Sequence, residues 1–404
     1  MYDPFDPAFQ ADPYPVYRRL RDEDPVHRHD GAPAYWALSR FADIWDAVRD
    51  TATFSSAQGL TFYPDEIGEL GLAPTIVMLD PPRHTRLRRL ISSGFTPRRV
   101  AALEDRLRAF VRDRIAAMER TAADGGTPDL HLDFSSPLPT FVVAHLLGVP
   151  EADRHRFGPW VSALTTFQDD GFDARALTSG PGVAAIAEMF GYFSELIPAR
   201  RADPGDDLIS ALTAAEADGE RLTDWDVLGF VFVMIAGGND TTGNLISHGV
   251  ALLDGDHAQR ERLAADPSLI PNALLEFLRL EGSVQSLGRT TTRPVVLHGV
   301  EIPAGEKVMM LYGSANRDER EFGPEADRLD VTRDIPRHLG FATGPHFCIG
   351  SHLAKLQARV AFEELLRAHP RVGVDLDRAE RIASPFTRGW RTLPATGMGT
   401  GRRR

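Results

Sequence analysis

The amino-acid sequence predicts a mainly α-helical fold with a small β region on a chain of 404 residues. Apolar residues recur with helical spacing over several long stretches, of which 100–118 and 223–253 are the clearest. Strand signals are few and short, at 294–297 and 307–311. No long linker rich in Pro, Gly or Ser divides the chain, so we expect a single domain.

The helical stretches share a one-sided apolar pattern. In residues 100–118 the stripe consists of Leu103, Leu107, Phe110, Val111, Ile115 and Met118. Residues 141–147 and 184–197 have similar patterns. We therefore expect these segments to pack as helices around a common core.

Residues 223–253 predict one long central helix. Thr223 is a favourable N-cap, and Asp224 and Asp226 suit the positive end of the helix dipole. At 1.5 Å per residue the helix would be about 45 Å long, enough to cross a domain. Short strands joined by His-Gly and Pro-Ala-Gly-Glu turns follow at 294–311.

Composition and charge exclude several classes of protein. One cysteine cannot form an intramolecular disulfide, so the chain is not a disulfide-stapled scaffold. A net charge of −12, with acidic residues spread along the chain, argues against a general nucleic-acid binder, which would show a basic face. The first residues lack a signal-peptide pattern, and the apolar run at 228–236 is far shorter than the ~20 residues of a membrane span. We expect a cytoplasmic protein without a membrane anchor.

The only cysteine, Cys348, lies in the segment GFATGPHFCIGSHLAK. Glycines keep this segment irregular, and helical spacing begins at Ser351, so the thiol lies just before a helix N-terminus that stabilises a thiolate. Three interpretations remain open: a buried inert cysteine, a nucleophile paired with His346 in a hydrolase, and a thiolate ligand of haem iron with His346 at a propionate.

The pattern formed by Phe341, Gly344, Cys348 and Gly350 resembles the haem-ligand loop of cytochromes P450. The resemblance implies haem b with the Cys348 thiolate as axial ligand and O2 as co-substrate. It implies a single-domain P450 fold with a long central helix over the haem. Its parts would be an N-terminal region with a small sheet and substrate loop (1–80), a helical body (81–280) and a C-terminal region with the haem-ligand loop (281–404).

Two glycines, Gly237 and Gly238, interrupt the predicted central helix and are followed by Asp240 and Thr241. Each glycine costs roughly 1 kcal/mol relative to alanine, so the pair needs a reason. A close helix crossing is one reason. The other, implied by the resemblance, is an oxygen-binding groove in which Thr241 donates to dioxygen and Asp240 relays protons.

Glu276 and Arg279 are three residues apart, which alone predicts only a helix-surface ion pair worth ~0.2–0.5 kcal/mol. In the P450 family such a pair supports the cysteine loop through a third arginine. Arg328 and Arg333 are both candidates for that arginine, and the sequence does not choose between them.

His84 and Arg88 lie one helical turn apart and therefore share a face. With Arg83, Arg86 and Arg89 nearby, a solvated basic face is one interpretation. The resemblance instead implies that His84 and Arg88 bind the haem propionates, together with Arg289 and His346.

The resemblance implies a monooxygenase that takes electrons from a separate ferredoxin and an NAD(P)H-dependent ferredoxin reductase, as soluble bacterial P450s do. The substrate would be a moderately large, mostly apolar organic molecule, and the pocket would be lined by Phe62, Phe167, Val284, Leu287 and Phe386. Alternatives are a non-catalytic haem sensor or carrier and a peroxide-driven peroxygenase, neither of which needs Asp240 and Thr241.

Overall fold

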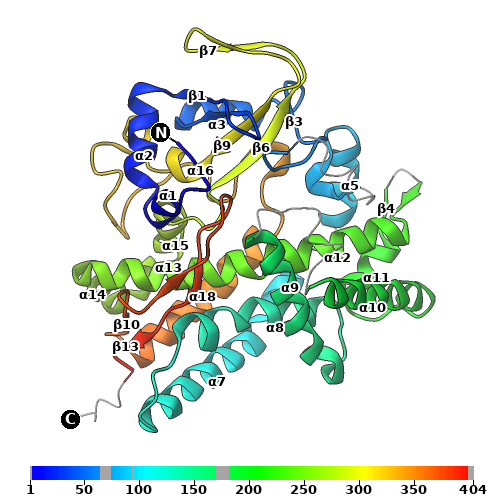
Figure 1. Cartoon of the computed structure of the whole chain (residues 1–404). Helices are drawn as coiled ribbons and strands as arrows, with labels where there is room; N and C mark the ends of the chain where they lie inside the picture. Colours follow the sequence, from blue (N-terminus) through cyan, green and yellow to red (C-terminus); the bar gives the residue numbers. More distant parts are fainter. Residues whose placement is uncertain are drawn as a thin grey trace.

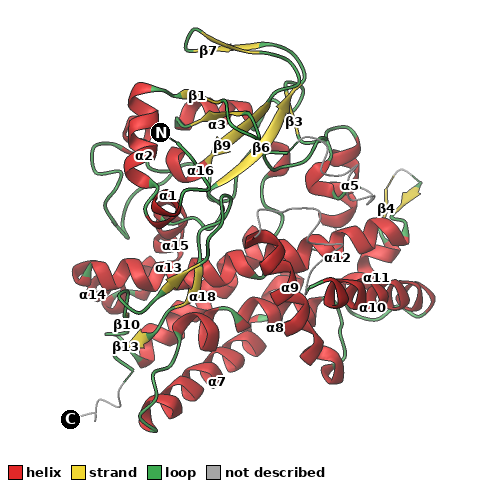
Figure 2. Cartoon of the chain, in the orientation of Figure 1, coloured by secondary structure: helices red, strands yellow, loops and turns green. Residues whose placement is uncertain are grey.

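The structure, a computed structural model, places its five-stranded sheet and the N-terminal helices together above a larger body of helices (Figures 1 and 2). It describes residues 2–63, 74–92, 95, 97–169, 182–217 and 219–398. Among these residues, no helix combines the length and the apolar composition that crossing a membrane requires. The mainly helical fold class with a small β region is confirmed.

The largest sheet brings together strands from both ends of the chain. Its order is β1 (Val26–His29), β2 (Tyr35–Leu38), β9 (Lys307–Leu311), β6 (Ser286–Thr291) and β3 (Phe54–Ser55). Strands β2 and β9 are parallel, whereas the other neighbours are antiparallel. The remaining described strands pair as β4 (Glu216–Ala217) with β5 (Glu220–Arg221), β7 (Val295–Leu297) with β8 (Val300–Ile302), β10 (Gly373–Val374) with β13 (Ala395–Thr396), and β11 (Glu380–Arg381) with β12 (Trp390–Thr392).

The two predicted strand signals are confirmed as β7 and β9, but the sequence did not indicate β6, because Gly288 interrupts its β-favouring residues. The structure explains this glycine. A Cβ at Gly288 would lie 2.7 Å from the Thr61 carbonyl oxygen, so only glycine lets the 60–61 backbone come this close.

Helices of two groups enclose the sheet and form the body. The N-terminal and sheet-associated helices are α1 (Pro7–Ala11), α2 (Tyr14–Glu23), α3 (Phe41–Ala47), α16 (Tyr312–Ala315) and α17 (Glu319–Phe322). The body contains α5 (Arg83–Ser92), α6 (Pro97–Ala101), α7 (Glu104–Ala123), α8 (Pro137–Leu146), α9 (Phe157–Asp169), α10 (Val183–Ala202), α11 (Leu208–Ala214), α12 (Asp224–Gly238), α13 (Asp240–Gly255), α14 (His257–Ala265), α15 (Ile270–Leu280) and α18 (Ser351–Ala368).

Short turns complete the described elements: 3-10 helices at Ile76–Met78, Glu151–Arg156, Pro267–Leu269 and Gly344–His346, and a π-helix at Leu130–Ser135. The predicted apolar stripe is confirmed in α7, which buries Leu107, Val111, Ile115 and Met118.

The prediction of one uninterrupted central helix was wrong, because the helix is divided at Asn239 into α12 and α13. The Asn239 side chain donates to the Ile235 carbonyl at 2.6 Å, and the Thr241 hydroxyl donates to the Gly237 carbonyl at 2.7 Å. Side chains thus take carbonyls that backbone amides would otherwise use, directly after two glycines that favour the helix least. The predicted N-cap is confirmed, since Thr223 and Asp226 form a capping box.

A network of charges joins α7 to α18, the helix that follows Cys348. Arg108 donates to Glu364 at 2.7 Å, Arg112 donates to it at 2.9 Å, and Arg367 also pairs with it. Burial would raise the pKa of Glu364, but these arginines lower it to about 2. The network therefore holds α7 against α18, the helix that directly follows the cysteine loop.

We predict that Glu364→Gln destabilises the protein in a pH-dependent way. The lowered pKa means that Glu364 stabilises the fold above its ordinary value of 4.5, and that this stabilisation disappears as pH falls toward about 2. The free energy of unfolding of the variant should be about 1–2 kcal/mol lower than that of the wild type at pH 7, and this difference should shrink in acid. Urea unfolding between pH 7 and pH 3 measures this. A difference that stays constant over this range would contradict the prediction.

Candidate haem site

Cys348 lies immediately before α18, as the sequence predicted. Its amide donates to the Phe341 carbonyl at 2.9 Å, and its own carbonyl accepts from the Ser351 amide at 3.3 Å. Burial raises the pKa of the thiol, while the Gly350 amide, Arg88 and the Ser351 amide act in the opposite direction. Burial is the largest of these effects and the pKa is raised overall, while the two amides and Arg88 are the contacts that act to stabilise a thiolate.

The loop before Cys348 has a backbone shape that suits glycine. Gly344 has φ +69°, and a Cβ there would lie 3.1–3.3 Å from Arg49 and Val48 atoms. Ala342, where the P450 family usually has a glycine or another small residue, has φ +53°. An alanine in this left-handed region costs about 1 kcal/mol or more, so the surrounding packing holds the loop in a strained shape.

Four cationic or proton-donating residues converge beside this loop. His84 and Arg88, on one face of α5, approach it together: the rings of His84 and His346 are 4.2 Å apart, and Arg88 acts on the thiol of Cys348. Arg289, on β6, is near enough to His346 to lower its pKa. Burial first, then these cationic neighbours, lower the pKa of His346 to about 3. A positive environment with this composition suits an anionic group.

These residues fit the carboxylates of a haem. The Nδ1 atom of buried His84 and the Nε atom of buried Arg289 have no hydrogen-bond partner among the described residues. Buried donors without partners cost free energy, so their arrangement favours a ligand with acceptor oxygens. A Cβ on Gly350 would lie 3.9 Å from the Cys348 sulfur, an ordinary van der Waals distance, so space beside the sulfur does not by itself require a glycine there.

Sequence reasoning missed two supports of this site, Asp80 and Ser56. The Asp80 carboxylate accepts from the Ser55 hydroxyl at 2.5 Å and from the Ser56 amide at 3.0 Å. The Ser56 hydroxyl lies 3.3 Å from Nε2 of His346. The backbone carbonyl of Asp80 accepts a hydrogen bond from the His84 amide at 2.9 Å. Asp80 therefore connects β3 to α5 and, through Ser56, to His346 of the cysteine loop. The only available signal was the proximity of Asp80 to His84 in sequence.

The glycine pair of the central helix faces space rather than a neighbouring helix. A Cβ on Gly237 would have no described atom within 4 Å, and one on Gly238 would only touch Val143 at 3.8 Å. A close helix crossing therefore does not explain the glycines. Asp240 begins α13, and Thr241 lies one turn beyond Gly237, so all four residues share the region where α12 ends and α13 begins.

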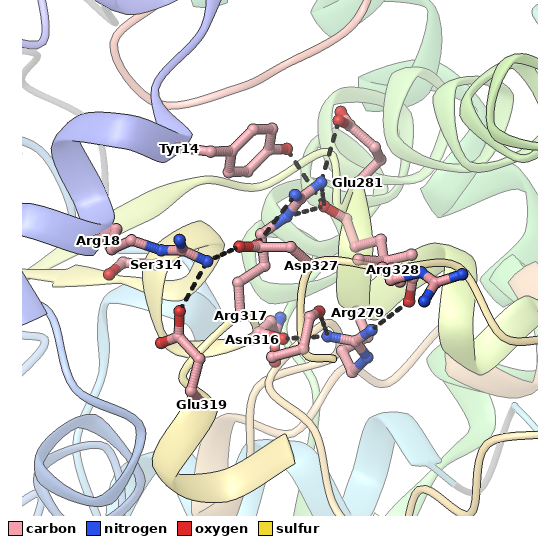
Figure 3. Close-up of polar contacts among 12 residues, drawn as sticks. Tyr14, Arg18, Arg279, Glu281, Ser314, Asn316, Arg317, Glu319, Asp327 and Arg328 are labelled. Carbon is pink, nitrogen blue, oxygen red and sulfur yellow. Dashed lines mark hydrogen bonds and ion pairs between the residues drawn. The ribbon is translucent and has the colours of Figure 1, made fainter. Parts of the chain in front are cut away.

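Glu276 and Arg279 form a fully buried pair, with Arg279 donating at 2.7 and 2.9 Å to the two carboxylate oxygens. Arg333 completes the cluster by donating to Glu276 at 3.1 Å, whereas Arg328 pairs with exposed Glu325. Of the two candidate arginines, Arg333 is therefore the one whose side chain contacts Glu276. Figure 3 shows the Arg279 guanidinium between Asn316 and Arg328, to whose backbone carbonyls it donates at 2.8 and 3.5 Å.

This cluster is connected to the cysteine loop through Asn316. Arg279 donates to the Asn316 carbonyl at 2.8 Å, and the Asn316 side chain accepts the Leu339 amide at 2.7 Å. Leu339 lies two residues before Phe341, whose carbonyl receives the Cys348 amide. A continuous series of hydrogen bonds therefore runs from the buried ion pair to the thiol-bearing residue.

Four of the five residues predicted to line the substrate pocket belong to one apolar cluster. Phe62 and Phe386 are fully buried, with ring centroids 4.7 Å apart, and Val284 and Leu287 pack against the same cluster. The side chain of the fifth, Phe167, lies outside the described residues. Their contact with a substrate stays a prediction.

The fold and this site define a class of protein: a helical haem protein whose iron is bound by a cysteine thiolate. A sequence model of the family described as Cytochrome P450 matches residues 265–370. Cytochrome P450 130 from Mycobacterium tuberculosis is 46% identical over 368 residues, which cover 89% of this chain and 88% of that relative. Vitamin D(3) 25-hydroxylase from Pseudonocardia autotrophica is 37% identical over 404 residues, covering 98% and 96%.

The solved structure of cytochrome P450 CYP109Q5 from Chondromyces apiculatus is similar with a TM-score of 0.86 and 33% identity, covering 98% of this chain and 97% of that one. The chain belongs to the cytochrome P450 family. Its cofactor is therefore haem bound through Cys348, its co-substrate is O2, and it is a monooxygenase. Membership also excludes the inert-cysteine and hydrolase interpretations of Cys348.

We predict that Arg333→Met and Arg328→Met have very different effects. Removing Arg333 leaves the buried Glu276 carboxylate incompletely compensated and should lower the free energy of unfolding by about 3 kcal/mol. Removing Arg328, whose ion pair is exposed, should cost less than ~0.5 kcal/mol. Denaturant unfolding, with the haem retained after gel filtration as a second measurement, distinguishes them. Equal effects would mean that Arg333 does not support the cluster.

Proposed function

We propose that this protein inserts one oxygen atom from O2 into a moderately large, mostly apolar organic substrate, with electrons from a separate ferredoxin. The observation that carries the proposal is the convergence of α5, β6 and the loop before α18 on Cys348, with Arg88 beside the thiol and His84 against His346. Reducing the purified protein under carbon monoxide tests the ligand: a long-wavelength Soret band is expected for the thiolate, and a band typical of histidine ligation would refute it.

In this proposal each residue of the site has one task. Cys348 binds the iron, and His84, Arg88, Arg289 and His346 hold the propionates through charge-assisted hydrogen bonds. Bound haem supplies the redox chemistry that activates oxygen.

Asp240 and Thr241 would supply protons on the opposite side of the site from the cysteine. The Thr241 hydroxyl donates to the Gly237 carbonyl at 2.7 Å, so its oxygen keeps the capacity to accept a proton or a hydrogen bond. Asp240 begins α13 next to it. In this proposal the Thr241 hydroxyl would turn from the Gly237 carbonyl and donate its proton toward dioxygen, and the Asp240 carboxyl would replace that proton. The pair favours oxygenation over gas sensing, carriage or peroxide-driven chemistry, because those functions need no proton relay.

The proposed substrate class follows from the walls. Phe62 and Phe386 are fully buried in one apolar cluster, Leu287 packs against it, and the buried polar residue Gln285 is hydrogen-bonded to Phe386. One relative of similar length carries the name Vitamin D(3) 25-hydroxylase, which supports a bulky apolar substrate for this chain. Vitamin D3 is therefore a reasonable first compound in a product screen.

We predict that Thr241→Ala uncouples oxygen consumption from product formation. Without the hydroxyl, protons no longer reach the oxygen in a controlled way, so product per O2 consumed should fall about tenfold or more while hydrogen peroxide rises. Thr241→Ser, which keeps the hydroxyl, is the matched control and should stay near wild type. If Thr241→Ala produces as much product per O2 as Thr241→Ser, the proposed proton role is wrong.

We also predict that turnover requires both a ferredoxin and an NAD(P)H-dependent ferredoxin reductase. Lys355, whose ammonium lies 5.5 Å from the Phe341 ring centre, offers positive charge near the site, whereas Arg86 is paired with Glu220. Turnover should stop when either partner is omitted and should slow as salt screens the contact. Product formation from NADH and reductase alone would contradict this prediction.

A further inference from the structure

A second buried charge cluster lies beside the predicted substrate walls, and no step described above uses it. Its centre is Glu281, the residue after α15, with a side chain 12% exposed. Arg388 donates to one carboxylate oxygen at 3.0 Å, and Arg317 lies 3.4 Å from the other. Both arginines are buried. Burial would raise the pKa of Glu281, but Arg388, His248 and Arg317 lower it to about 2, so the carboxylate is ionised.

The N-terminal part of the chain closes this cluster. The Arg317 guanidinium carbon lies 3.4 Å from the centre of the Tyr14 ring, and both residues donate to the Leu280 carbonyl. Figure 3 shows Tyr14 and Arg317 meeting next to Glu281. Arg388 donates further to the carbonyls of Gln10 and Ala11, at 2.8 and 3.1 Å. The guanidinium of Arg388 therefore joins three segments that are distant in sequence.

Arg388 also belongs to the segment that carries Phe386. This segment pairs with the one that carries Val284 and Leu287, because the Arg388 amide donates to the Ser283 carbonyl at 2.7 Å and the Gln285 amide donates to the Phe386 carbonyl at 2.8 Å. The two predicted walls are thus one hydrogen-bonded unit. Arg388, which pairs with Glu281, connects this unit to the N-terminal region through the carbonyls of Gln10 and Ala11.

A small pocket lies directly behind this unit. It is lined by Phe9, Pro13 and Tyr17 on the N-terminal side and by Ser384, Pro385 and Thr387 on the other. Tight packing alone would hold residues 384–387 in place, but the pocket beside them leaves space into which this segment can move. The position of Phe386 then depends on Arg388 rather than on packing alone.

We propose that Glu281 and Arg388 are positioning residues that hold the hydrogen-bonded unit of the two substrate walls against the N-terminal region and so determine which ligands the pocket accepts. The inference rests on the proposed function, in which these walls face the substrate. Releasing the pair lets the Phe386 segment move into the pocket behind it, which loosens contacts to any ligand that fills the space beside the walls. A ligand too small to reach the walls is unaffected.

The test compares two iron-binding ligands of different size on the haem-loaded protein. Imidazole ligates the iron but is too small to fill the pocket, whereas 4-phenylimidazole adds an apolar ring. In Arg388→Met and Glu281→Gln we expect the Kd of 4-phenylimidazole, measured by the shift of the Soret band, to rise about tenfold while that of imidazole changes less than twofold. Arg388→Lys, which keeps the charge, should recover part of the loss.

Arg391→Met is the matched control, because it removes the same charge from an exposed position three residues away. It should leave both dissociation constants unchanged. Equal weakening of both ligands, or no change in either, would overturn the inference, since a purely structural role moves only the melting temperature or affects both alike. If Arg388→Met fails to fold, Glu281→Gln and Arg388→Lys decide. Absence of any oxygenated product refutes the proposed function but leaves this ligand comparison intact.

Discussion

The buried ion pair between Glu276 and Arg279 is the constraint on which the cysteine loop depends. Moving two charges out of water costs several kcal/mol per ion, so the pair persists only because nearly every polar atom has a partner. Glu276 receives both Arg279 and Arg333, and Arg279 uses its remaining donors on the Asn316 and Ala326 carbonyls. Those carbonyls belong to loops without regular structure, which the charge therefore holds in one shape.

The same short helix also positions the second charge cluster, because Glu281 is the first residue after α15, which ends at Leu280. Glu276 is fully buried among loops that lead to Cys348, while Glu281 meets arginines from the Phe386 segment and from the N-terminal side. One helix thus positions two carboxylates that pair with arginines, Glu276 within α15 and Glu281 at its C-cap. On our proposals, the first fixes the iron ligand and the second the substrate walls, so α15 keeps the two in register.

The sequence predicted the features that depend on local spacing, such as residues sharing a helix face. It did not predict the features that depend on contacts between residues distant in sequence. His84 and Arg88 share a face because they lie within one helix, and Cys348 precedes a helix whose apolar pattern is visible. Arg333 could not be chosen over Arg328, because only the fold decides which of them returns to Glu276, 57 residues away. The break at Asn239 was missed because it depends on side-chain hydrogen bonds that the apolar pattern does not reveal. Strand β6 and the Arg388–Glu281 pair depend likewise on contacts between distant segments.

The distribution of charge explains why an acidic chain binds an anionic cofactor. The net charge is −12, yet the buried carboxylates of Glu276 and Glu281 are each neutralised by two arginines. Around Cys348 the balance is reversed: Arg88 and Arg289 lie beside two histidines, with Asp80 engaged by two serines. A local excess of positive charge in a poorly hydrated site attracts carboxylates far more strongly than the distant surface charge repels them, since salt screens that repulsion beyond ~10 Å. On our proposal, cofactor binding is therefore decided by these few residues and not by the net charge.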